Sequence, residues 1–373
     1  MLAPAVQIDN HIYGYVQKQD IKQVIDMFLS EFQNESKKYE VCNYNKAEVR
    51  ICLCSSCSAS GSNKIYNELT RCIKKFGYPV NLKIVSCMGI SYKTPLIQII
   101  DEKSFFYHYG NVSINSIESI LHYHFKPKKI VNKIRSRFSN FVSAIYEKKD
   151  IDENRFGLND NYFLQQEHIT TELCGETSPI DIDEYKKNKG FLALRHVLKQ
   201  NRNTIIEELK KSGLRGRGGA GFFTGEKWEL TKKAVAGKKY VICNADEGDP
   251  GAFMDRSVLE GDPFLLIEGM LIASYAIGAD EGYIYCRAEY PLALKRINKA
   301  IMQLEKQSLL GKNICGKKHS FFLHVKEGAG AFVCGEETAL MHSIEGKRGM
   351  PRLRPPFPAE SGIFGCPSNI NNV

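Results

Sequence analysis

Residues 239–256 read KYVICNADEGDPGAFMDR, and this segment is the strongest indicator of the fold class of the second half of the chain. Its first five residues are mostly apolar and include β-branched side chains, which predicts a buried strand over 239–243. Three acids, Asp246, Glu247 and Asp249, follow this strand. Because open α/β sheets bind ligands at the carboxyl ends of their strands, we expect a ligand site here. A ligand-free polar turn and an oxygen-rich divalent metal site remain alternatives.

Strands and helices alternate through the rest of this half. The sequence predicts helices over 263–276 and 291–307 and strands over 283–285 and 321–325. The apolar run over 263–279 contains a glutamate and is shorter than the roughly 20 residues of a membrane span, so it predicts a buried helix. This alternation is typical of the α/β class.

A glycine-rich segment precedes the strand. Residues 213–225 read GLRGRGGAGFFTG, with six glycines, and Lys227 and Trp228 follow. Glycines let backbone N–H groups approach an anion closely, and Arg215, Arg217 and Lys227 supply positive charge, so we expect phosphate binding. The segment lacks the Gly-Lys-Ser/Thr ending of a P-loop, and we expect no regular helix directly after it.

The first half carries most of its cysteines on turns. Strands are predicted over 49–53, 80–85 and 96–100, with a helix over 64–76, which makes a βαββ-like unit. Cys52 and Cys57 flank the turn after the first strand, and Cys87 follows the second strand. An amphipathic helix is predicted over 21–32.

The chain has 373 residues, enough for two or three domains of roughly 150 residues. No basic segment followed by an apolar core opens it, so we expect a cytoplasmic protein whose 12 cysteines are thiols, metal ligands or redox centres. Of the net charge of +9, only residues 126–137 form a concentrated run, interpreted as a solvated connector, with a docking strip for an acidic partner as the alternative. No nucleic-acid-binding motif accompanies it. The expected domains are a helical extension over 1–45, a cysteine-bearing domain over 46–125, a linker over 126–162 and a second domain over 163–373.

Five ordered motifs carry a resemblance to a known family. They are SGLRGRGGAGFFTGEKW at 212–228, NADEGDPGAFMDR at 244–256, GAGAFVCGEETALM at 328–341, PRLRPPFP at 351–358 and NINNV at 369–373. Together they resemble the FMN- and NADH-binding flavoprotein subunit of respiratory complex I. With the cysteine-bearing domain in front, the chain is most similar to the diaphorase (beta) subunit of NAD(P)-linked, electron-bifurcating iron hydrogenases. The resemblance implies a thioredoxin-like [2Fe–2S]-type domain followed by a Rossmann-like α/β domain that binds FMN and NAD(H) or NADP(H).

The resemblance also assigns roles to residues. It implies no catalytic side chain, because hydride passes directly between the nicotinamide and the flavin. The FMN site would comprise Gly216, Gly218, Lys227, Asn244, Asp246, Gly335, Asn371 and Asn372. The dinucleotide would meet Phe222 at the adenine and Glu247, Asp249 and Glu337 at ribose or carboxamide groups, with Glu336 nearby and Arg354 and Phe357 at the outer end. Phe332 stands where complex I subunits commonly have Tyr, and Asp249 where they tend to have Glu.

The resemblance implies an NAD(P)H:acceptor oxidoreductase subunit. Its electrons would pass to iron–sulfur partner subunits, such as an iron hydrogenase catalytic subunit and a small thioredoxin-like [2Fe–2S] subunit, with no nucleic acid and no membrane insertion. The family continues beyond Val373 into a domain with a [4Fe–4S] motif, so we expect a C-terminally truncated sequence. The contrasting hypothesis is a non-catalytic remnant or binding module without flavin. NAD is not distinguished from NADP.

The implied [2Fe–2S] pattern is Cys-x4-Cys followed by Cys-x3-Cys. Cys52, Cys57 and Cys87 match three positions as metal ligands, whereas Ser91 occupies the fourth. Cys54 is the alternative fourth ligand, and a degenerate scaffold without metal is the other interpretation. Cys243, Cys286 and Cys334 are expected in strand-like core positions.

Overall fold

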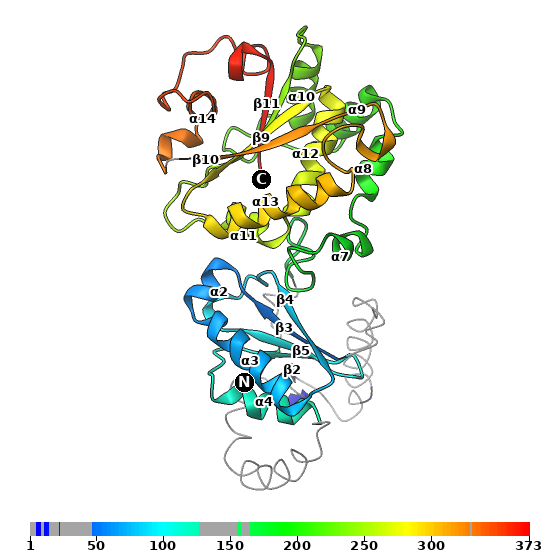
Figure 1. The fold of residues 1–373 in the computed structure, drawn as a ribbon, viewed down its shortest axis with the longest axis vertical. Helices are drawn as coiled ribbons and strands as arrows, with labels where there is room; N and C mark the ends of the chain where they lie inside the picture. The colour runs from blue at the N-terminus through cyan, green and yellow to red at the C-terminus, as the bar shows by residue number, and fades with distance from the viewer. Residues whose placement is uncertain are drawn as a thin grey trace.

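The structure, a computed structural model, describes residues 5–8, 11–14, 22, 47–126, 155–157, 165–328 and 330–373. Two bodies, each with its own sheet, lie one above the other in Figure 1. We call residues 47–126 with 155–157 the N-terminal body and residues 165–373 the C-terminal body. The α/β class expected from the sequence is confirmed.

The C-terminal body is built on a four-stranded parallel sheet. Its strands are β8 (Tyr240–Ala245), β9 (Glu281–Arg287), β10 (Phe322–Gly328) and β11 (Ser368–Asn372), in the spatial order β10-β9-β8-β11. The chain therefore builds outward from β8 in one direction and then returns to its other side with β11. Such a reversal is the topological switch point at which doubly wound sheets bind ligands. Here it lies between β8 and β11.

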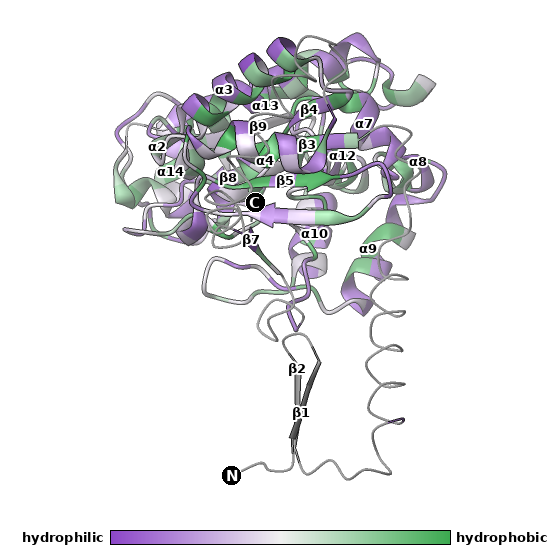
Figure 2. Cartoon of the chain, turned by 90° about the horizontal axis from the view of Figure 1, so that it is seen from below, coloured by the Kyte–Doolittle hydropathy of each residue, from purple (hydrophilic) through white to green (hydrophobic). Residues whose placement is uncertain are grey.

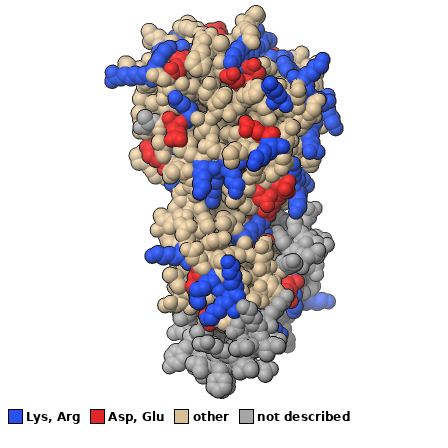
Figure 3. Space-filling model, in the orientation of Figure 1, with Lys and Arg blue, Asp and Glu red and all other residues tan. Residues whose placement is uncertain are grey.

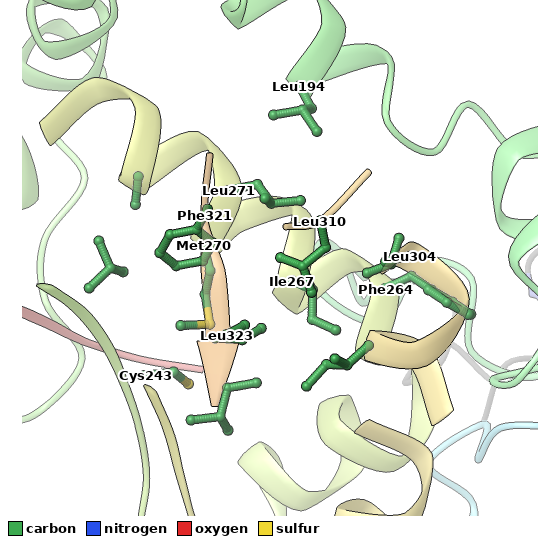
Figure 4. Close-up of a cluster of buried hydrophobic side chains, with 14 of the residues drawn as sticks. Leu194, Cys243, Phe264, Ile267, Met270, Leu271, Leu304, Leu310, Phe321 and Leu323 are labelled. Carbon is green, nitrogen blue, oxygen red and sulfur yellow. The ribbon is translucent and has the colours of Figure 1, made fainter. Parts of the chain in front are cut away.

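Both faces of this sheet are covered, as parallel sheets require. Val241 and Cys243 point into a large core shared with α12 (Pro263–Ile277) and α13 (Pro291–Lys306), part of which Figure 4 shows. Ile242 points the opposite way, into a smaller core with α14 (Glu337–Ile344). The remaining elements of this body are α7 (Ile182–Lys187), α8 (Leu192–Val197), α9 (Arg202–Lys211), α10 (Thr224–Lys233), α11 (Met254–Gly261), η2 (Ile314–Gly316), η3 (Phe332–Gly335) and η4 (Ile363–Gly365).

Helix α12 confirms the predicted buried helix. Proline occupies its first turn, the Asp262 carboxylate accepts a hydrogen bond from Leu265 N at 3.1 Å, and Gly278 ends the helix with φ of +84°. Such capping satisfies backbone groups that the helix itself leaves free. The Glu268 carboxylate is buried on this helix and accepts hydrogen bonds from Tyr185 Oη and Phe191 N, both at 2.7 Å. Partners of this kind make a charge in the core tolerable.

The N-terminal body has a five-stranded mixed sheet in the order β4-β3-β5-β6-β7. β3 and β4 are parallel, and the other pairs are antiparallel. Helices α3 and α4 pack on one face of the sheet over a core of isoleucine, leucine and aromatic side chains. The elements are β3 (Ala47–Cys52), α2 (Ser55–Ala59), α3 (Ser62–Phe76), β4 (Val80–Val85), η1 (Ser91–Lys93), β5 (Ile97–Ile100), β6 (Phe106–Tyr109), α4 (Ser116–His124) and β7 (Arg155–Phe156).

The two bodies meet where α2 lies next to α11 (Figure 1). The Glu260 carboxylate accepts hydrogen bonds from the backbone N and the hydroxyl of Ser55, at 2.8 and 2.5 Å. Arg296 donates to Leu53 O at 3.1 Å, and Arg256 donates to Ser56 Oγ at 3.0 Å. The turn that follows β3 is therefore held directly by the C-terminal body.

Two sequence predictions for the N-terminal part need correction. Within the expected helical extension over 1–45, β1 (Ala5–Ile8) pairs with β2 (His11–Gly14) as an antiparallel hairpin. Val6, Gln7 and Ile8 alternate in polarity, which is the strand period rather than the helical one. Within the expected linker over 126–162, β7 adds an edge strand to the N-terminal sheet. The predicted helix over 21–32 lies outside the described residues except for Lys22.

The surface mixes both signs of charge. On the face that Figure 3 shows, lysines and arginines are interspersed with acids over both bodies. In Figure 2, α3 and α13 carry hydrophilic and hydrophobic residues along their length, as helices that cover a sheet do. Among the described residues, no helix combines the length and the apolar character needed to cross a membrane. Of the basic run over 126–137, only Lys126 is described.

Candidate functional site

The candidate site begins at the switch point between β8 and β11. Asn244 and Asn372 are register partners at the carboxyl ends of these strands. The glycine loop reaches the same place, because a Cβ added to Gly218 would lie 3.3 Å from Asn372 Oδ1. Residues predicted from three separate motifs, Gly218, Asn244 and Asn372, are therefore brought together.

The glycine loop is closed by backbone hydrogen bonds. Gly216 N donates to Phe222 O at 2.8 Å, and Thr224 N donates to Leu214 O at 2.9 Å. Gly219 and Gly221 have φ of +97° and +63°, and nothing lies within 4 Å of a Cβ added to either. The tip of the loop thus combines a left-handed backbone with open space, which leaves room for a ligand.

A regular helix does follow the loop, contrary to the prediction. α10 begins at Thr224, one residue after the loop closes. The helix was not predicted because it begins with a threonine and a glycine, which have low helix propensity. Its later turns contain strong helix formers such as Lys227, Leu230 and Lys232. The helix matters because it carries Lys227 and Trp228 beneath the loop.

The three positive side chains of this region play different roles. The Arg215 guanidinium lies 3.9 Å from the centre of the Phe223 ring and donates to Gly221 O at 3.1 Å, so it holds the loop together. Arg217 is exposed. Burial lowers the pKa of Lys227, while Glu337, whose Oε2 lies 3.7 Å from Lys227 Nζ, opposes that shift. Lys227 is therefore the positive charge placed between the loop and α14.

Asp246 supplies an unpartnered acceptor next to these residues. We call the surface formed by the glycine loop, Lys227, Asn244, Asp246, Gly335 and Asn372 the cradle. Its Oδ2 is buried, and within the part of the chain that the structure describes it has no hydrogen-bond partner. Gly335 lies against it, since a Cβ at Gly335 would be 3.5 Å from Oδ2. Burial raises the pKa of Asp246, while Arg287 lowers it. Asn244 fixes this corner by donating to Gly335 O at 2.9 Å and accepting from Asp246 N at 3.1 Å.

The acids after η3 tie the site to the loop over 351–358. Glu337 forms ion pairs with Lys227 and Arg354, which come from α10 and from that loop. Glu336 caps α14 by accepting hydrogen bonds from Thr338 N and Ala339 N, both at 2.9 Å. One oxygen of Glu336 is thus occupied by its own helix while the other lies 3.8 Å from Arg354, and Glu337 lies between Lys227 and Arg354.

The loop after β8 forms a pocket of about 400 Å³. Asp249 is exposed at its wall. Glu247 also lines it, but its buried carboxylate accepts from Asp255 N and Arg256 N at 3.1 Å and from Tyr290 Oη at 3.2 Å, capping α11. The lining residues are Glu247, Gly248, Asp249, Pro250, Gly251, Ala252, Phe253, Arg256, Arg287, Glu289 and Tyr290.

Four aromatic rings of the predicted motifs are exposed. Phe222, Phe253, Phe332 and Phe357 expose 50%, 50%, 69% and 53% of their surface, although such rings are normally buried. Phe332 lies against Gly248, where a Cβ would be 2.8 Å from its ring. These faces are available for stacking on a planar group.

Some site residues were missed or have other partners. Arg287 and Tyr290 line the pocket but were not predicted as site residues. The strand predicted over 283–285 in fact runs to Arg287. The carboxyl end of this strand is the feature that could have identified them. Asn371 Oδ1 accepts from Trp228 Nε1 at 3.1 Å and from Asn369 Nδ2 at 2.7 Å, so it ties β11 to α10.

The cysteines of the N-terminal body form a second cluster. The Sγ atoms of Cys52, Cys54, Cys57 and Cys87 all lie within 4.8 Å of one another. Ser91, the residue at the fourth family position, is exposed, and its Oγ is 4.0 Å from Cys87 Sγ. A set of four thiols is the donor set of zinc sites and of iron–sulfur centres. The fourth thiol is that of Cys54.

Of the three cysteines expected in strand-like core positions, two lie in strands and one does not. Cys243 and Cys286 are buried in β8 and β9, as predicted. Cys334 is buried in the 3-10 helix η3, so its predicted strand-like setting is wrong. The glycines on both sides of this segment allow the tight turn that the apolar pattern concealed.

Comparisons with known proteins found relatives of the C-terminal part of the chain. The NADP-reducing hydrogenase subunit HndC of Solidesulfovibrio fructosivorans is 53% identical over 209 residues, which cover 56% of this chain and 42% of that protein. An NADH-quinone oxidoreductase subunit of Aquifex aeolicus (strain VF5) is 53% identical over 192 residues, covering 52% of this chain and 45% of that protein. The chain thus spans about half the length of the curated relatives it matches.

A solved NAD+-reducing [NiFe]-hydrogenase in the H2-reduced state is similar with a TM-score of 0.47 and 26% identity, over 87% of this chain and 50% of that chain.

Residues 209–373 match the family described as the Nuo51 FMN-binding domain. The matched range contains the glycine loop, Lys227, Asn244, Asp246, Gly335 and Asn372, which are the residues of the cradle. This part of the chain is thus similar to the Nuo51 FMN-binding domain family.

Proposed function

We propose that the cradle between β8 and β11 binds FMN and that the adjoining surface binds NAD(H) or NADP(H), so that the chain exchanges a hydride between the two. When bound, FMN supplies the chemistry that accepts a hydride from the nicotinamide. The residues of this chain bind and orient the two molecules, and no side chain acts as acid or base.

The observation that carries this proposal is the buried Oδ2 of Asp246. A buried acceptor without a donor costs free energy, so a fold that keeps one has a use for it. The polar edge of a flavin ring and a ribityl chain both offer N–H or O–H donors. The glycines of the loop, the positive charge of Lys227 and the neighbouring Asn244 and Asn372 fit a phosphate-bearing, hydroxyl-rich cofactor at the same place.

The dinucleotide half of the site rests on exposed aromatic rings and free acids. Phe222 offers a ring for the adenine, and Phe357 borders the outer end beside Arg354. Asp249 lines the pocket and offers a carboxylate to ribose hydroxyls. Glu337 serves better as the partner of Lys227 and Arg354, and Glu247 as the cap of α11, than as ribose ligands. The choice between NAD and NADP stays open.

We infer the wider setting from the relatives. The printed names of HndC and of the Aquifex aeolicus relative place those proteins in an NADP-reducing hydrogenase and an NADH-quinone oxidoreductase. By analogy, electrons from this chain pass to iron–sulfur partner subunits of a hydrogenase or complex I-like assembly, in the cytoplasm. The same analogy implies a thioredoxin-like N-terminal body with a [2Fe–2S] cluster, in whose place we propose a single metal ion below. It also implies a [4Fe–4S] domain in a longer chain.

The experiment is FMN binding by the full chain. The purified protein, mixed with FMN and desalted, is expected to keep the flavin absorption bands. Gly218→Val is expected to lose them, because its side chain would fill the space beside Asn372. Gly237→Ala serves as a control, since nothing lies within 4 Å of an added Cβ there and the position lies outside the cradle. Retention of FMN by Gly218→Val at the wild-type level would refute the site, and a wild-type chain that never keeps FMN would support a flavin-free binding module instead.

A further inference from the structure

We propose that Cys52, Cys54, Cys57 and Cys87 hold a single tetrahedral metal ion, Zn²⁺ or Fe²⁺, through four thiolates, with Cys54 in place of Ser91. This centre differs both in ligands and in nuclearity from the [2Fe–2S] cluster implied by the sequence resemblance. It is independent of flavin binding by the C-terminal body.

The fold brings the four cysteines to one edge of the N-terminal sheet. β3 and β4 are parallel and adjacent, with Cys52 opposite Val85, so the turns that follow them leave the sheet side by side. Cys54 and Cys57 come from the first turn and the start of α2, and Cys87 comes from the second turn. The spacing Cys54-x2-Cys57 is the chelating pair typical of structural zinc sites.

The spacing of the sulfurs decides the nuclearity. Four thiolates at about 2.3 Å from one zinc ion form a tetrahedron whose edges are about 3.8 Å. Here all four Sγ atoms lie within 4.8 Å of one another. A two-iron cluster instead binds two thiolates on each iron, with bridging sulfides between, so sulfurs on different irons lie farther apart than sulfurs on one metal. A compact set in which no two sulfurs are more than 4.8 Å apart fits one ion.

The surroundings favour thiolates and exclude Ser91. Cys54 N donates to Cys52 Sγ at 3.4 Å, and Gly89 N donates to Cys87 Sγ at 3.3 Å. Cys52, Cys54 and Cys57 expose 3%, 6% and 1% of their surface. A metal ion bound by these thiols would be shielded from water. Ser91 is exposed and its Oγ lies 4.0 Å from Cys87 Sγ, whereas Cys54 is buried among the other three cysteines.

The site is built at the junction of the two bodies. The turn between Cys52 and Cys57 contains Leu53, Ser55 and Ser56, whose polar atoms bind Arg296, Glu260 and Arg256 of the C-terminal body. Next to Cys87, Ser86 Oγ accepts from Gly175 N at 3.3 Å. A metal ion here fixes both turns in the shape that the C-terminal body contacts. The centre therefore has a structural role at the junction of the two bodies.

The test uses the full chain, purified without oxygen. Metal analysis is expected to find about one zinc or iron per chain and no acid-labile sulfide. X-ray absorption at the edge of that metal is expected to show four sulfur ligands. Two irons with two sulfides per chain would overturn the proposal, and so would a shell of three sulfurs and one oxygen. Because these measurements use the wild-type protein, they do not depend on the folding of a variant.

Variants then identify the fourth ligand. Metal-free protein is titrated with Co²⁺, whose visible bands report tetrahedral thiolate coordination, and saturation is expected at one ion per chain. Cys54→Ser is expected to weaken Co²⁺ binding at least tenfold, and Cys54→His to restore it with shifted bands, because imidazole is also a zinc-type ligand. Ser91→Ala and Cys72→Ser, the latter a buried cysteine of α3 outside the cluster, should leave the titration unchanged. Loss of binding in Ser91→Ala, with full binding in Cys54→Ser, would contradict the assignment.

Discussion

Replacing Asp246 by alanine should weaken FMN binding without weakening the fold. If the buried Oδ2 accepts a hydrogen bond from the flavin or the ribityl chain, the variant loses a bond to a charged group, worth about 1.5–3 kcal/mol. At 1.4 kcal/mol for each factor of ten, the Kd for FMN should rise roughly tenfold to roughly hundredfold.

The fold should respond in the opposite direction. In the FMN-free protein the carboxylate oxygen is buried without a donor, which costs about 1–3 kcal/mol. Removing it relieves that cost, although the shorter side chain of alanine also packs less well. The free energy of unfolding of the FMN-free variant is therefore expected to equal or exceed that of the wild type. A residue with this pair of effects serves binding rather than folding.

Two assays measure the pair of effects. FMN titration followed by the quenching of flavin fluorescence gives the Kd, and urea unfolding of the FMN-free protein gives the stability. Asp262→Asn is the matched control, because Asp262 has a buried, unpartnered Oδ2 at the start of α12, outside the cradle. The assigned role of Asp246 is wrong if Asp246→Ala binds FMN as tightly as the wild type, or if Asp262→Asn weakens FMN binding as much as Asp246→Ala does.

Further predictions concern the dinucleotide, the pH dependence and the junction. Phe222→Ala should weaken NADH binding by about 1–3 kcal/mol, the value of base–aromatic stacking in nucleic-acid complexes, while FMN content stays unchanged; equal NADH affinity in stopped-flow reduction would exclude the stacking role. Burial, together with Glu247, raises the pKa of Asp255 to about 7 from a usual value near 3.8. Between about pH 4 and pH 7 the folded state then holds a proton that the unfolded state has lost, so stability should fall as the pH rises through this range. Urea unfolding should show this fall in the wild type and a smaller one in Asp255→Asn; equal slopes would contradict the assignment. Glu260→Ala leaves the backbone N–H and the hydroxyl of Ser55 without an acceptor, each at about 1–3 kcal/mol, whereas Glu281→Ala removes only a partly exposed ion pair with Lys238, worth about 0–1 kcal/mol. Equal losses of unfolding free energy in these two variants would show that the junction contact contributes no more than a partly exposed ion pair.

Patterns of polarity predicted β3, β4, β5, β8, β9 and β10 and the helices α3, α12 and α13, but no strand was predicted at β6, β7 or β11. The strand over 239–243 and the helix over 263–276 were found because burial imposes a period or an unbroken apolar run on the sequence. α10 escaped prediction because its first turn, at Thr224 and Gly225, is composed of residues typical of loops. Side-chain periodicity carries little information about such a start.

The candidate site, too, was predicted only in part. The resemblance carried by the ordered motifs implied that Gly218, Asn244 and Asp246 share one site, and the structure brings Gly218 and Asn244 to Asn372. The different fates of Glu247 and Asp249 could not be predicted, since both are acids in one turn and only the fold decides that backbone N–H groups of α11 face Glu247. Likewise, spacing alone left Cys54 and Ser91 as alternatives, and the distances between sulfurs distinguish them.

Hydride exchange between a nicotinamide dinucleotide and FMN is tested most directly by reducing the FMN-loaded full chain with NADH or NADPH without oxygen. We expect at least one of the two dinucleotides to bleach the flavin absorption, and Asp246→Ala to reach the same end point only at a higher FMN concentration. A flavin that is bound in the wild-type protein but stays oxidised under an excess of both dinucleotides would contradict the proposed function.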